Sequence, residues 1–487
     1  MLRAHPPKCS IGYEARLSAS VPTANADFDR ARLTWLERAL RTFTDVRPGE
    51  GTTAILMFAN VFLILCAYYF IKPLREGWLS ASGTGGLSKL ELRAYTAFGQ
   101  SLLLVPVLAY YGRLVGRWPR AVLIQRATLF CMTNMFAFWA LQPNFLFHNP
   151  PGIGVLFYLW VGIFSVFVVA QFWAFAADLY TEERGNRLLP MIAIGATAGG
   201  AVGSWLVDQF VSSGLVPTRH LLVAALVPLA LSIWLTRIAD RREGVAAEQT
   251  KIDLPQADHR GALGLVFRTR YLLIVGCVML LANWVKTNGE NQLYDVVQKT
   301  LEGDAAAHGL VAADAVKHFV KERTTAFYGD FFFWVNVAAL ALQAVFASRI
   351  LKYGGFGTLF LMLPVIALVS YSAMALLPLL WVVKGLQIPV NATDYSIQNT
   401  ARHVLWLPMS QEVTFKGKPT VDSLFMRAGD GMAALTVLVG VQLSSPSRTF
   451  FAWNVALVIA WLLAAVWVVR RHRKLSADSH APHGSGG

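Results

Sequence analysis

The chain has 487 residues, of which 55% are hydrophobic and only 15% carry a charge. With a mean hydropathy of +0.47, this composition excludes an ordinary soluble globular protein and indicates a membrane protein. The net charge of +14 would suit a nucleic-acid partner, but the basic residues do not cluster in a folded soluble motif, so we expect no nucleic-acid binding.

Residues 1–50 precede the first long apolar stretch and contain one amphipathic segment, at 29–43. Leu33, Leu36 and Leu40 fall on one helical face there, while arginines occupy the other faces. The pattern favours two placements equally. The helix lies on the inner surface of the membrane, or it packs on the cytoplasmic loops.

Twelve apolar stretches follow, each close to the length of about 20 residues that a helix needs to cross a bilayer. The predicted spans are 54–76, 94–112, 120–142, 152–178, 187–212, 219–238, 270–290, 326–348, 356–377, 379–402, 424–444 and 449–470. We expect a mixed-charge loop at 295–325 and a disordered cytoplasmic tail at 471–487. The chain is therefore predicted to be an all-α polytopic membrane protein that contacts the lipid bilayer.

The longest polar interruption, 239–268, falls after the sixth predicted span. We interpret it as a cytoplasmic linker between two six-helix halves, residues 51–238 and 269–470. Six spans, a linker and six spans is the layout of the major facilitator architecture.

Lysines and arginines collect in alternate loops, which the positive-inside rule places in the cytoplasm. These residues are Arg113, Arg117, Arg120, Arg184, Arg187, Arg237, Arg241, Arg242, Lys251, Arg260, Arg268, Arg349, Lys352, Arg402, Lys416, Lys418, Arg470, Arg471, Arg473 and Lys474. We therefore expect a multi-pass protein of the inner (cytoplasmic) membrane with both termini in the cytoplasm.

The fifth predicted span contains Gly195, Gly199 and Gly203 at a strict spacing of four residues. Small residues at this spacing let two helix backbones approach closely in lipid. A phosphate-binding loop is the alternative, but it requires a Gly-Lys-Ser/Thr ending after a strand, which is absent from the sequence. We predict a helix-packing seam.

Charged residues interrupt the first span at Lys72, Arg75 and Glu76. They share one helical face, and Pro73 between them removes a backbone hydrogen bond. A charge in the bilayer costs several kcal/mol unless it faces protein or water, so such residues usually mark a substrate or ion path. The alternative is that 72–76 lies at the outer interface, where the cations extend to water.

The seventh span repeats this pattern with Lys286 and Glu290, four residues apart. Polar interruptions at corresponding positions of two halves point to a central binding site. The alternative is an inert ion pair between these two side chains.

The tenth span is the most polar of all. Its polar residues are Lys384, Asn391, Asp394, Tyr395, Gln398, Asn399 and Arg402. Asp178 closes the fourth span and is followed by Glu182, Glu183, Arg184 and Arg187. For that cluster, tethering or gating on the cytoplasmic side competes evenly with contact to a substrate.

No Ser-His-Asp arrangement, zinc motif or pair of catalytic carboxylates stands out, and the ten histidines are dispersed. We therefore expect no enzyme, no metal site and no cofactor.

Four segments resemble the ATP:ADP antiporter family, the nucleotide translocases of plastids and obligate intracellular bacteria. They are Tyr69-Phe-Ile-Lys-Pro-Leu-Arg-Glu76, the block 172–203, Asn283-Trp-Val with Tyr328-Gly-Asp330, and the stretch from Tyr395 to Arg427. The last segment is the most specific because residues and spacing match over about thirty positions. The resemblance covers residues of about 50–470 and implies the major facilitator fold.

The resemblance also implies roles for three residues. Arg75 matches the family's basic residue in the first span, Asp178 its acidic residue closing the fourth, and Arg402 its basic residue after the tenth. Lys286 stands where the family usually has an acidic residue, and Asn399 and His403 each replace another. ATP/ADP exchange is therefore the leading hypothesis rather than a direct consequence of the resemblance.

Three hypotheses follow. In the first, a secondary carrier moves a small anionic or phosphorylated solute, such as ATP or ADP, by alternating access. Lys72, Arg75, Lys286 and Arg402 hold the anion, while Glu76, Glu290 and Asp394 compete for these cations or carry a coupling proton. In the second, the carrier moves a different anionic metabolite, a siderophore-like compound or an amphiphile. In the third, the protein is a membrane scaffold that transports nothing.

Overall fold

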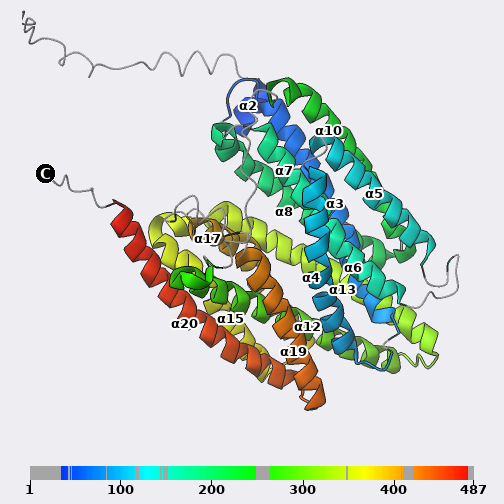
Figure 1. Ribbon diagram of the computed structural model, residues 1–487. Coiled ribbons are helices and arrows are strands. Elements are labelled where there is room, and N and C mark those ends of the chain that lie inside the picture. Colours follow the sequence, from blue (N-terminus) through cyan, green and yellow to red (C-terminus); the bar gives the residue numbers. More distant parts are fainter. Residues whose placement is uncertain are drawn as a thin grey trace, which may run out of the picture.

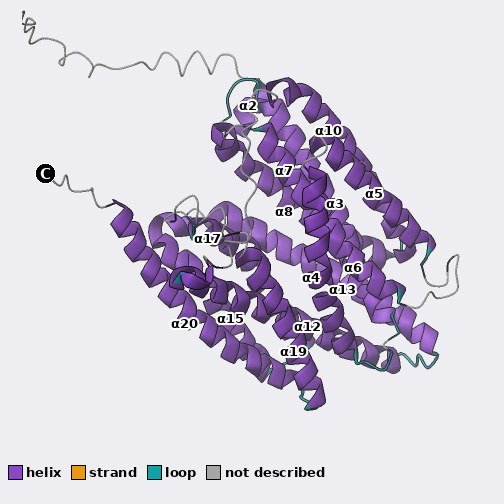
Figure 2. Cartoon of the chain, viewed as in Figure 1, coloured by secondary structure: helices purple, strands orange, loops and turns teal. Residues whose placement is uncertain are grey.

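A computed structural model describes residues 34–41, 44, 46–83, 85–115, 120–142, 145, 152–180, 182–247, 264, 266–346, 349–406, 409, 418 and 421–480. All regular secondary structure in these residues is helical (Figure 2). His403 and Lys416, which the sequence comparison singles out, lie outside the described side chains, as does most of the predicted linker.

The N-terminal half consists of a short helix and six long helical segments (Figure 1). Its elements are α2 (Trp35–Leu40), α3 (Gly51–Ala81), α4 (Lys89–Val115), α5 (Arg120–Ala140), α6 (Ile153–Phe164), η1 (Ser165–Val169), α7 (Ala170–Leu179), α8 (Glu182–Ser213), η2 (Thr218–His220), α9 (Leu221–Ala224) and α10 (Leu226–Ala247).

The C-terminal half contributes six further segments. Its elements are α12 (Arg270–Ala307), α13 (Ala313–Ala341), η3 (Leu342–Phe346), η4 (Ile350–Gly354), α15 (Gly355–Leu376), α16 (Leu380–Thr393), η5 (Asp394–Gln398), α17 (Asn399–Val404), η6 (Val421–Phe425), α19 (Met426–Gln442) and α20 (Ser447–His480).

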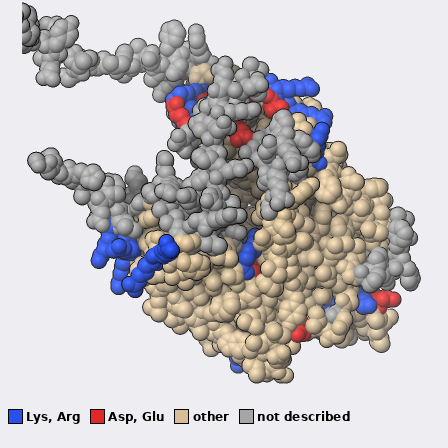
Figure 3. Space-filling model, in the orientation of Figure 1, with Lys and Arg blue, Asp and Glu red and all other residues tan. Residues whose placement is uncertain are grey.

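These helical segments overlap all twelve predicted spans, and the predicted fold class is confirmed. Eight of the described helices are long and apolar enough to cross a membrane by length and composition. Large apolar side chains such as Phe130, Trp234 and Leu463 are exposed on the sides of the bundle. Figure 3 shows lysines and arginines mainly at the edges of a broad uncharged surface. This distribution suits a lipid-facing belt.

Two sequence predictions are wrong in detail. The predicted loop at 295–325 is mostly helical, because α12 continues to Ala307 and α13 already begins at Ala313. The predicted disordered tail is helical up to His480, the end of α20, and only 481–487 lie outside the described residues. In both places the helix continues for several polar turns beyond its apolar part. A prediction from hydropathy alone therefore ends the helix too early.

Gly195, Gly199 and Gly203 lie along the contact between α8 and α3. A Cβ atom on Gly195 would come within 2.8 Å of the Phe58 carbonyl oxygen, and one on Gly203 within 2.5 Å of the Cys66 carbonyl oxygen. The two backbones therefore approach as closely as a small-residue seam permits.

The two halves contact each other mainly through α3 and α8 against α13, and through α4 against α12 and α19. Figure 1 shows the halves diverging toward the end of the bundle where α2 and the end of α20 lie, which we call the terminal face. Contacts between the halves are found at the opposite end. There Thr218 donates a hydrogen bond to Glu322, and the Lys321 ammonium lies 5.5 Å from the Trp78 ring.

Candidate functional site

The charged residues of α3 are buried in the protein rather than placed at the outer interface. Lys72 and Arg75 are each 8% exposed and Glu76 only 1%. Arg75 Nε lies 3.1 Å from one carboxylate oxygen of Glu76, and its guanidinium lies 4.5 Å from the Tyr158 ring. The interfacial alternative for 72–76 is therefore wrong, because the side chains do not extend to water.

A second arginine, Arg93 of α4, completes this group. Arg93 is 2% exposed, and its Nε lies 3.2 Å from the other oxygen of Glu76. Its guanidinium also pairs with Glu290 of α12 at 3.6 Å and donates a hydrogen bond to Asn291. Arg93 thus links a carboxylate of its own half to a carboxylate of the other half.

Sequence reasoning missed Arg93 because it directly precedes the predicted span 94–112. At that position a charge is typical of an interface. Helix α4 begins four residues earlier, at Lys89, so Arg93 is one turn inside the helix. The sequence signal that could have identified Arg93 was its position directly beside a predicted span boundary.

Asp394 is the centre of a second group of charges in the C-terminal half. The Lys286 ammonium lies 2.7 Å from one of its carboxylate oxygens, and an Arg402 guanidinium nitrogen lies 3.0 Å from the other. Lys286 therefore pairs with Asp394 and Glu290 with Arg93, so the alternative of an inert Lys286–Glu290 pair is wrong.

Asp394 and Tyr395 begin η5, a π-helical turn between α16 and α17. Such turns insert an extra residue into a helix, redirect side chains and are frequent at functional sites. Asp394 is buried, and Arg402 is half-buried eight residues further along.

Lys72 differs from its charged neighbours because it has no carboxylate partner among the described residues. Its ammonium donates a 3.3 Å hydrogen bond to the Tyr395 hydroxyl and lies 3.9 Å from the centre of the Phe332 ring. The rings of Tyr69 and Tyr395 follow at 5.1 Å and 5.6 Å. Aromatic faces stabilise a cation only modestly compared with a buried carboxylate.

We call these eight charged side chains the central site. They are the cations Lys72, Arg75, Arg93, Lys286 and Arg402, and the carboxylates Glu76, Glu290 and Asp394. Five cations against three carboxylates leave two positive charges in excess. Lys286, Glu290 and Arg402 are only half-buried, with side chains 32%, 33% and 27% exposed, so they are accessible to a solute.

Two smaller polar groups lie near the interface of the halves. Lys384 pairs with Asp330, between α16 and α13. Asp430 of α19 accepts hydrogen bonds from Asn283 at 2.7 Å and from Thr287 at 2.9 Å. The Ser101 hydroxyl of α4 also bonds to Asp430, so this second group again crosses between the halves.

Two further predicted site residues do not belong to the buried groups. Asp178 is exposed, one residue before the end of α7, and Asn399 is exposed at the start of α17. Tyr395 is half-buried and contacts both Lys72 and Lys286. Of the predicted site residues, the structure thus brings together those of the first and seventh spans with Asp394, Tyr395 and Arg402 of the tenth, and it adds Arg93 of α4.

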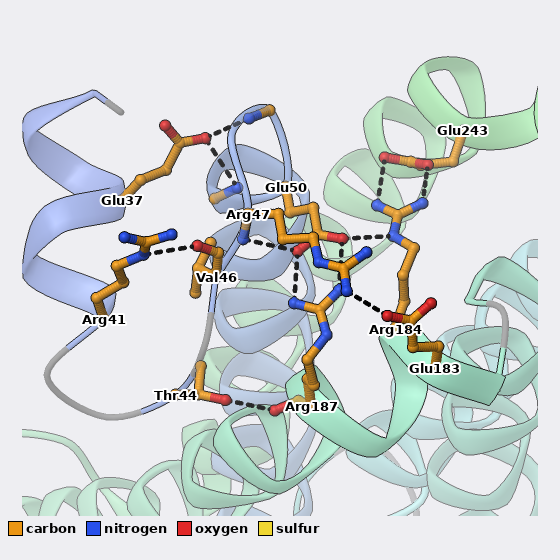
Figure 4. Close-up of polar contacts among 12 residues, drawn as sticks. Glu37, Arg41, Thr44, Val46, Arg47, Glu50, Glu183, Arg184, Arg187 and Glu243 are labelled. Atoms are coloured by element: carbon orange, nitrogen blue, oxygen red, sulfur yellow. Dashed lines mark hydrogen bonds and ion pairs between the residues drawn. The ribbon is translucent and has the colours of Figure 1, made fainter. Parts of the chain in front are cut away.

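At the terminal face, the N-terminal half carries a separate set of ion pairs, Glu50, Arg184, Arg187 and Glu243, which we call the terminal clasp (Figure 4). Two Arg187 guanidinium nitrogens each donate a 3.0 Å hydrogen bond to Glu50. Arg184 pairs with Glu50 at 3.2 Å and with Glu243 at 3.0 Å. These contacts connect the starts of α3 and α8 to the end of α10, as a tether within one half would.

Burial opposes the charged form of Glu50, but hydrogen bonds from Arg187 and from the Arg47 backbone outweigh it, together with the charges of both clasp arginines. The pKa of Glu50 is therefore lowered from its ordinary value. The clasp is ionised at neutral pH.

Helix α2 packs against the clasp end of α3. Glu37 accepts a 2.6 Å hydrogen bond from the Gly49 backbone, and Arg41 donates one of 3.1 Å to the Val46 carbonyl (Figure 4). The described part of the segment 29–43 thus makes packing contacts with the chain that leads into α3, and its placement on the membrane surface stays a prediction.

No family model matches the chain. A curated protein that it resembles is ADP,ATP carrier protein 1 of Chlamydia muridarum (strain MoPn / Nigg), with 22% identity over 346 residues. The match covers 62% of this chain and 61% of the carrier, less than two thirds of the carrier's length. It confirms the resemblance to the ATP:ADP antiporter family that the sequence motifs indicate.

Solved transporter structures are similar over most of the chain. The crystal structure of the human organic anion transporter MFSD10 (TETRAN) has a TM-score of 0.53 and 15% identity, covering 86% of this chain and 100% of that chain. The nucleoside transporter NupG has a TM-score of 0.58 and 13% identity, covering 85% and 99%. At such identities the likeness shows the fold alone. The chain is a multi-pass membrane protein with the major facilitator fold.

Proposed function

We propose that this protein is a transporter of a small anionic solute that carries phosphate groups, and that it exchanges ATP for ADP by alternating access. The observation that carries the proposal is the excess of cations in the central site. Five cations face three carboxylates, and Lys72 has no carboxylate partner among the described residues.

The types of cation support a phosphate-bearing solute. Arg75, Arg93 and Arg402 present planar guanidinium groups, which bind phosphate oxygens through two parallel hydrogen bonds. Lys72 and Lys286 supply point charges near Tyr395, 5.6 Å and 5.0 Å from the centre of its ring. A polyphosphate could therefore engage several cations at once.

The carboxylates give the empty site a way to keep its cations paired. Glu76 lies between Arg75 and Arg93, and Asp394 lies between Lys286 and Arg402. A buried cation without a partner is costly, so an empty site is stabilised by these internal pairs. An incoming phosphate would replace carboxylates as the partner of the same cations, which is the competition that exchange requires.

Aromatic rings border the site, among them the half-buried Tyr68, on which a nucleobase would stack in this proposal. Tyr68, Tyr69 and Phe332 come from two different halves and lie close together, with ring centres 5.3 Å apart for Tyr68–Tyr69 and 5.8 Å for Tyr69–Phe332. Stacking of a base on such rings contributes about 1–3 kcal/mol. This arrangement favours a nucleotide over a compact inorganic anion.

Alternating access requires contacts between the halves that can break. Arg93–Glu290, Lys72–Tyr395 and Ser101–Asp430 all join residues of one half to residues of the other. We assign the terminal face to the cytoplasm of an inner membrane on the positive-inside rule, so the described arrangement would open inward. Asp178 is exposed near this face, so it would contact the solute only while the solute enters or leaves the central site.

The test is uptake of labelled ATP into proteoliposomes loaded with ADP, with unloaded proteoliposomes and protein-free liposomes as controls. Uptake that depends on internal ADP supports exchange. Absence of uptake by folded protein would overturn the nucleotide assignment. Uptake of a different anionic metabolite, a siderophore-like compound or an amphiphile, without competition from ATP, would then identify the alternative carrier. A scaffold would show no flux for any of these solutes.

A further inference from the structure

A cavity of about 650 Å³ lies apart from the central site, at the terminal face of the C-terminal half. It is formed by the start of α12 and the end of α20. Its lining residues are Thr269, Arg270, Tyr271, Met409, Trp467, Arg470, Arg471 and Lys474.

Positive charge dominates this cavity. Four of the eight lining residues are cations and none is acidic. In the described part of the chain, no ion pair joins any of the four to a carboxylate. The Arg270 guanidinium lies 5.9 Å from the Trp467 ring, and Figure 3 shows lysines and arginines gathered where α20 leaves the bundle. The cavity is therefore suited to an anion.

Two neutral features reinforce this preference. Helix α12 begins at Arg270, and Thr269 in front of it provides no side-chain cap, so the helix N-terminus adds its positive dipole to the cavity. The Tyr271 hydroxyl is buried and has no hydrogen-bond partner among the residues that the structure describes. Tyr271 lines the cavity and is only 7% exposed. A buried hydroxyl without a partner is costly, and a ligand oxygen would satisfy it.

The surface of α20 beside the cavity distinguishes a lipid from a soluble anion. Ile459 and Leu463 precede Trp467 by eight and four residues, so the three fall on one helical stripe. Ile459 is 47% exposed and Leu463 is 69% exposed. Along α20 the stripe passes from exposed aliphatic side chains through an aromatic ring to the basic residues. A membrane lipid has the same order of groups, from acyl chain to charged headgroup.

We propose that this cavity binds the phosphate headgroup of an anionic phospholipid, whose acyl chains lie along the Ile459–Leu463 stripe. Arg270, Arg470, Arg471 and Lys474 surround the phosphate, and the Tyr271 hydroxyl donates a hydrogen bond to it. The lipid bridges the first and last helices of the C-terminal half. The proposal does not depend on which solute the protein transports.

The test compares thermal unfolding of the full-length protein in neutral detergent with added phosphatidylglycerol, phosphatidylcholine or inorganic phosphate. The site variant combines Arg470→Gln and Lys474→Gln. The matched control combines Arg448→Gln and Arg473→Gln, which removes the same charge from α20 outside the cavity. A ligand that binds only the folded state raises the unfolding midpoint.

We expect phosphatidylglycerol to raise the midpoint of the wild type and of the control by several degrees more than phosphatidylcholine does. The site variant loses this difference. Native mass spectrometry should show one phosphatidylglycerol fewer retained on the site variant. Tyr271→Phe, which keeps every charge, should reduce the shift and provides the test if the double variant does not fold.

Three results would overturn the proposal. The first is an equal shift with phosphatidylcholine, and the second is an unchanged phosphatidylglycerol shift in the site and Tyr271→Phe variants. The third is the same stabilisation by inorganic phosphate alone, which would make the cavity a site for soluble anions.

Discussion

The central site and the terminal clasp are built from the same chemistry, arginines paired with carboxylates, but they differ in what they join. The clasp connects α3, α8 and α10, all in one half. The central site includes Arg93–Glu290 and Lys72–Tyr395, which connect the two halves. Under the proposed alternating access, only the second kind of contact lies where the halves move relative to each other. In this account, the position of an ion pair relative to the interface of the halves, more than its strength, separates a structural role from the proposed role in transport.

The largest expected effect comes from a change at the central site. Lys286→Gln removes a proposed ligand of the anion and one partner of Asp394, while Arg402 remains paired with that carboxylate. We expect ADP-dependent ATP uptake to fall to the level of protein-free liposomes. Membrane insertion of this variant and its elution profile in size-exclusion chromatography should be the same as those of the wild type. Wild-type uptake by this variant would remove Lys286 from the site.

A change in the α3–α8 seam should affect folding within one half instead. A Cβ atom on Gly199 would meet the Phe62 backbone, whereas one on Gly185 of the same helix would lie 3.5 Å from Leu189, an ordinary contact. We expect Gly199→Ala to lower the free energy of unfolding by about 1–3 kcal/mol. Gly185→Ala, the matched control, should be neutral or slightly stabilising. Equal stability of the two variants, measured by thermal unfolding, would argue against close packing at Gly199.

Within the clasp, Arg187→Gln removes two hydrogen bonds to Glu50 and leaves Arg184 as its partner. The expected loss in the free energy of unfolding is about 1–3 kcal/mol. Uptake per folded molecule should stay within roughly twofold of the wild type, since hydrogen bonds of this kind contribute to stability rather than to the moving interface. A large loss of uptake at normal stability would place the clasp in the transport mechanism.

The smallest expected effect is a pH dependence of stability. Because the pKa of Glu50 is lowered in the folded protein, its contribution is fully present above its ordinary value of 4.5 and is lost as pH falls through the folded-state pKa. Thermal unfolding between pH 7 and pH 3 should show this loss in the wild type. Glu50→Gln should be less stable at pH 7 and should lack this component of the decline. An identical pH profile for both proteins would exclude Glu50 as its source.

Hydropathy predicts most of this fold because lipid imposes one simple rule, a long apolar helix, on every span. It fails at α12 and α13, where polar turns such as those around Asp295 and Lys321 continue a helix beyond its apolar part. The charged faces of the first, seventh and tenth spans were predictable because charges are rare in lipid-embedded helices.

The partners within the central site were not predictable from one sequence. Spacing along a helix suggests that Lys286 pairs with Glu290, four residues away. Its partner is Asp394, 108 residues further along the chain. Such pairs depend on how separate helices pack, and the π-helical turn that directs Asp394 inward has no clear sequence mark. Arg93 was missed for a related reason. Its partners, Glu76 and Glu290, lie on α3 and α12 rather than on its own helix.

The most direct test compares Arg93→Gln with Arg187→Gln in the same exchange assay, at matched amounts of folded protein. Each variant removes one arginine that pairs with carboxylates, at the central site or in the clasp. Breaking a buried, hydrogen-bonded charge pair costs about 2–5 kcal/mol, so we expect Arg93→Gln to reduce ADP-dependent ATP uptake by roughly 30-fold or more. Arg187→Gln should retain nearly all of it. Full exchange by Arg93→Gln, or an equal loss in both variants, would contradict the division between a moving central site and a fixed clasp.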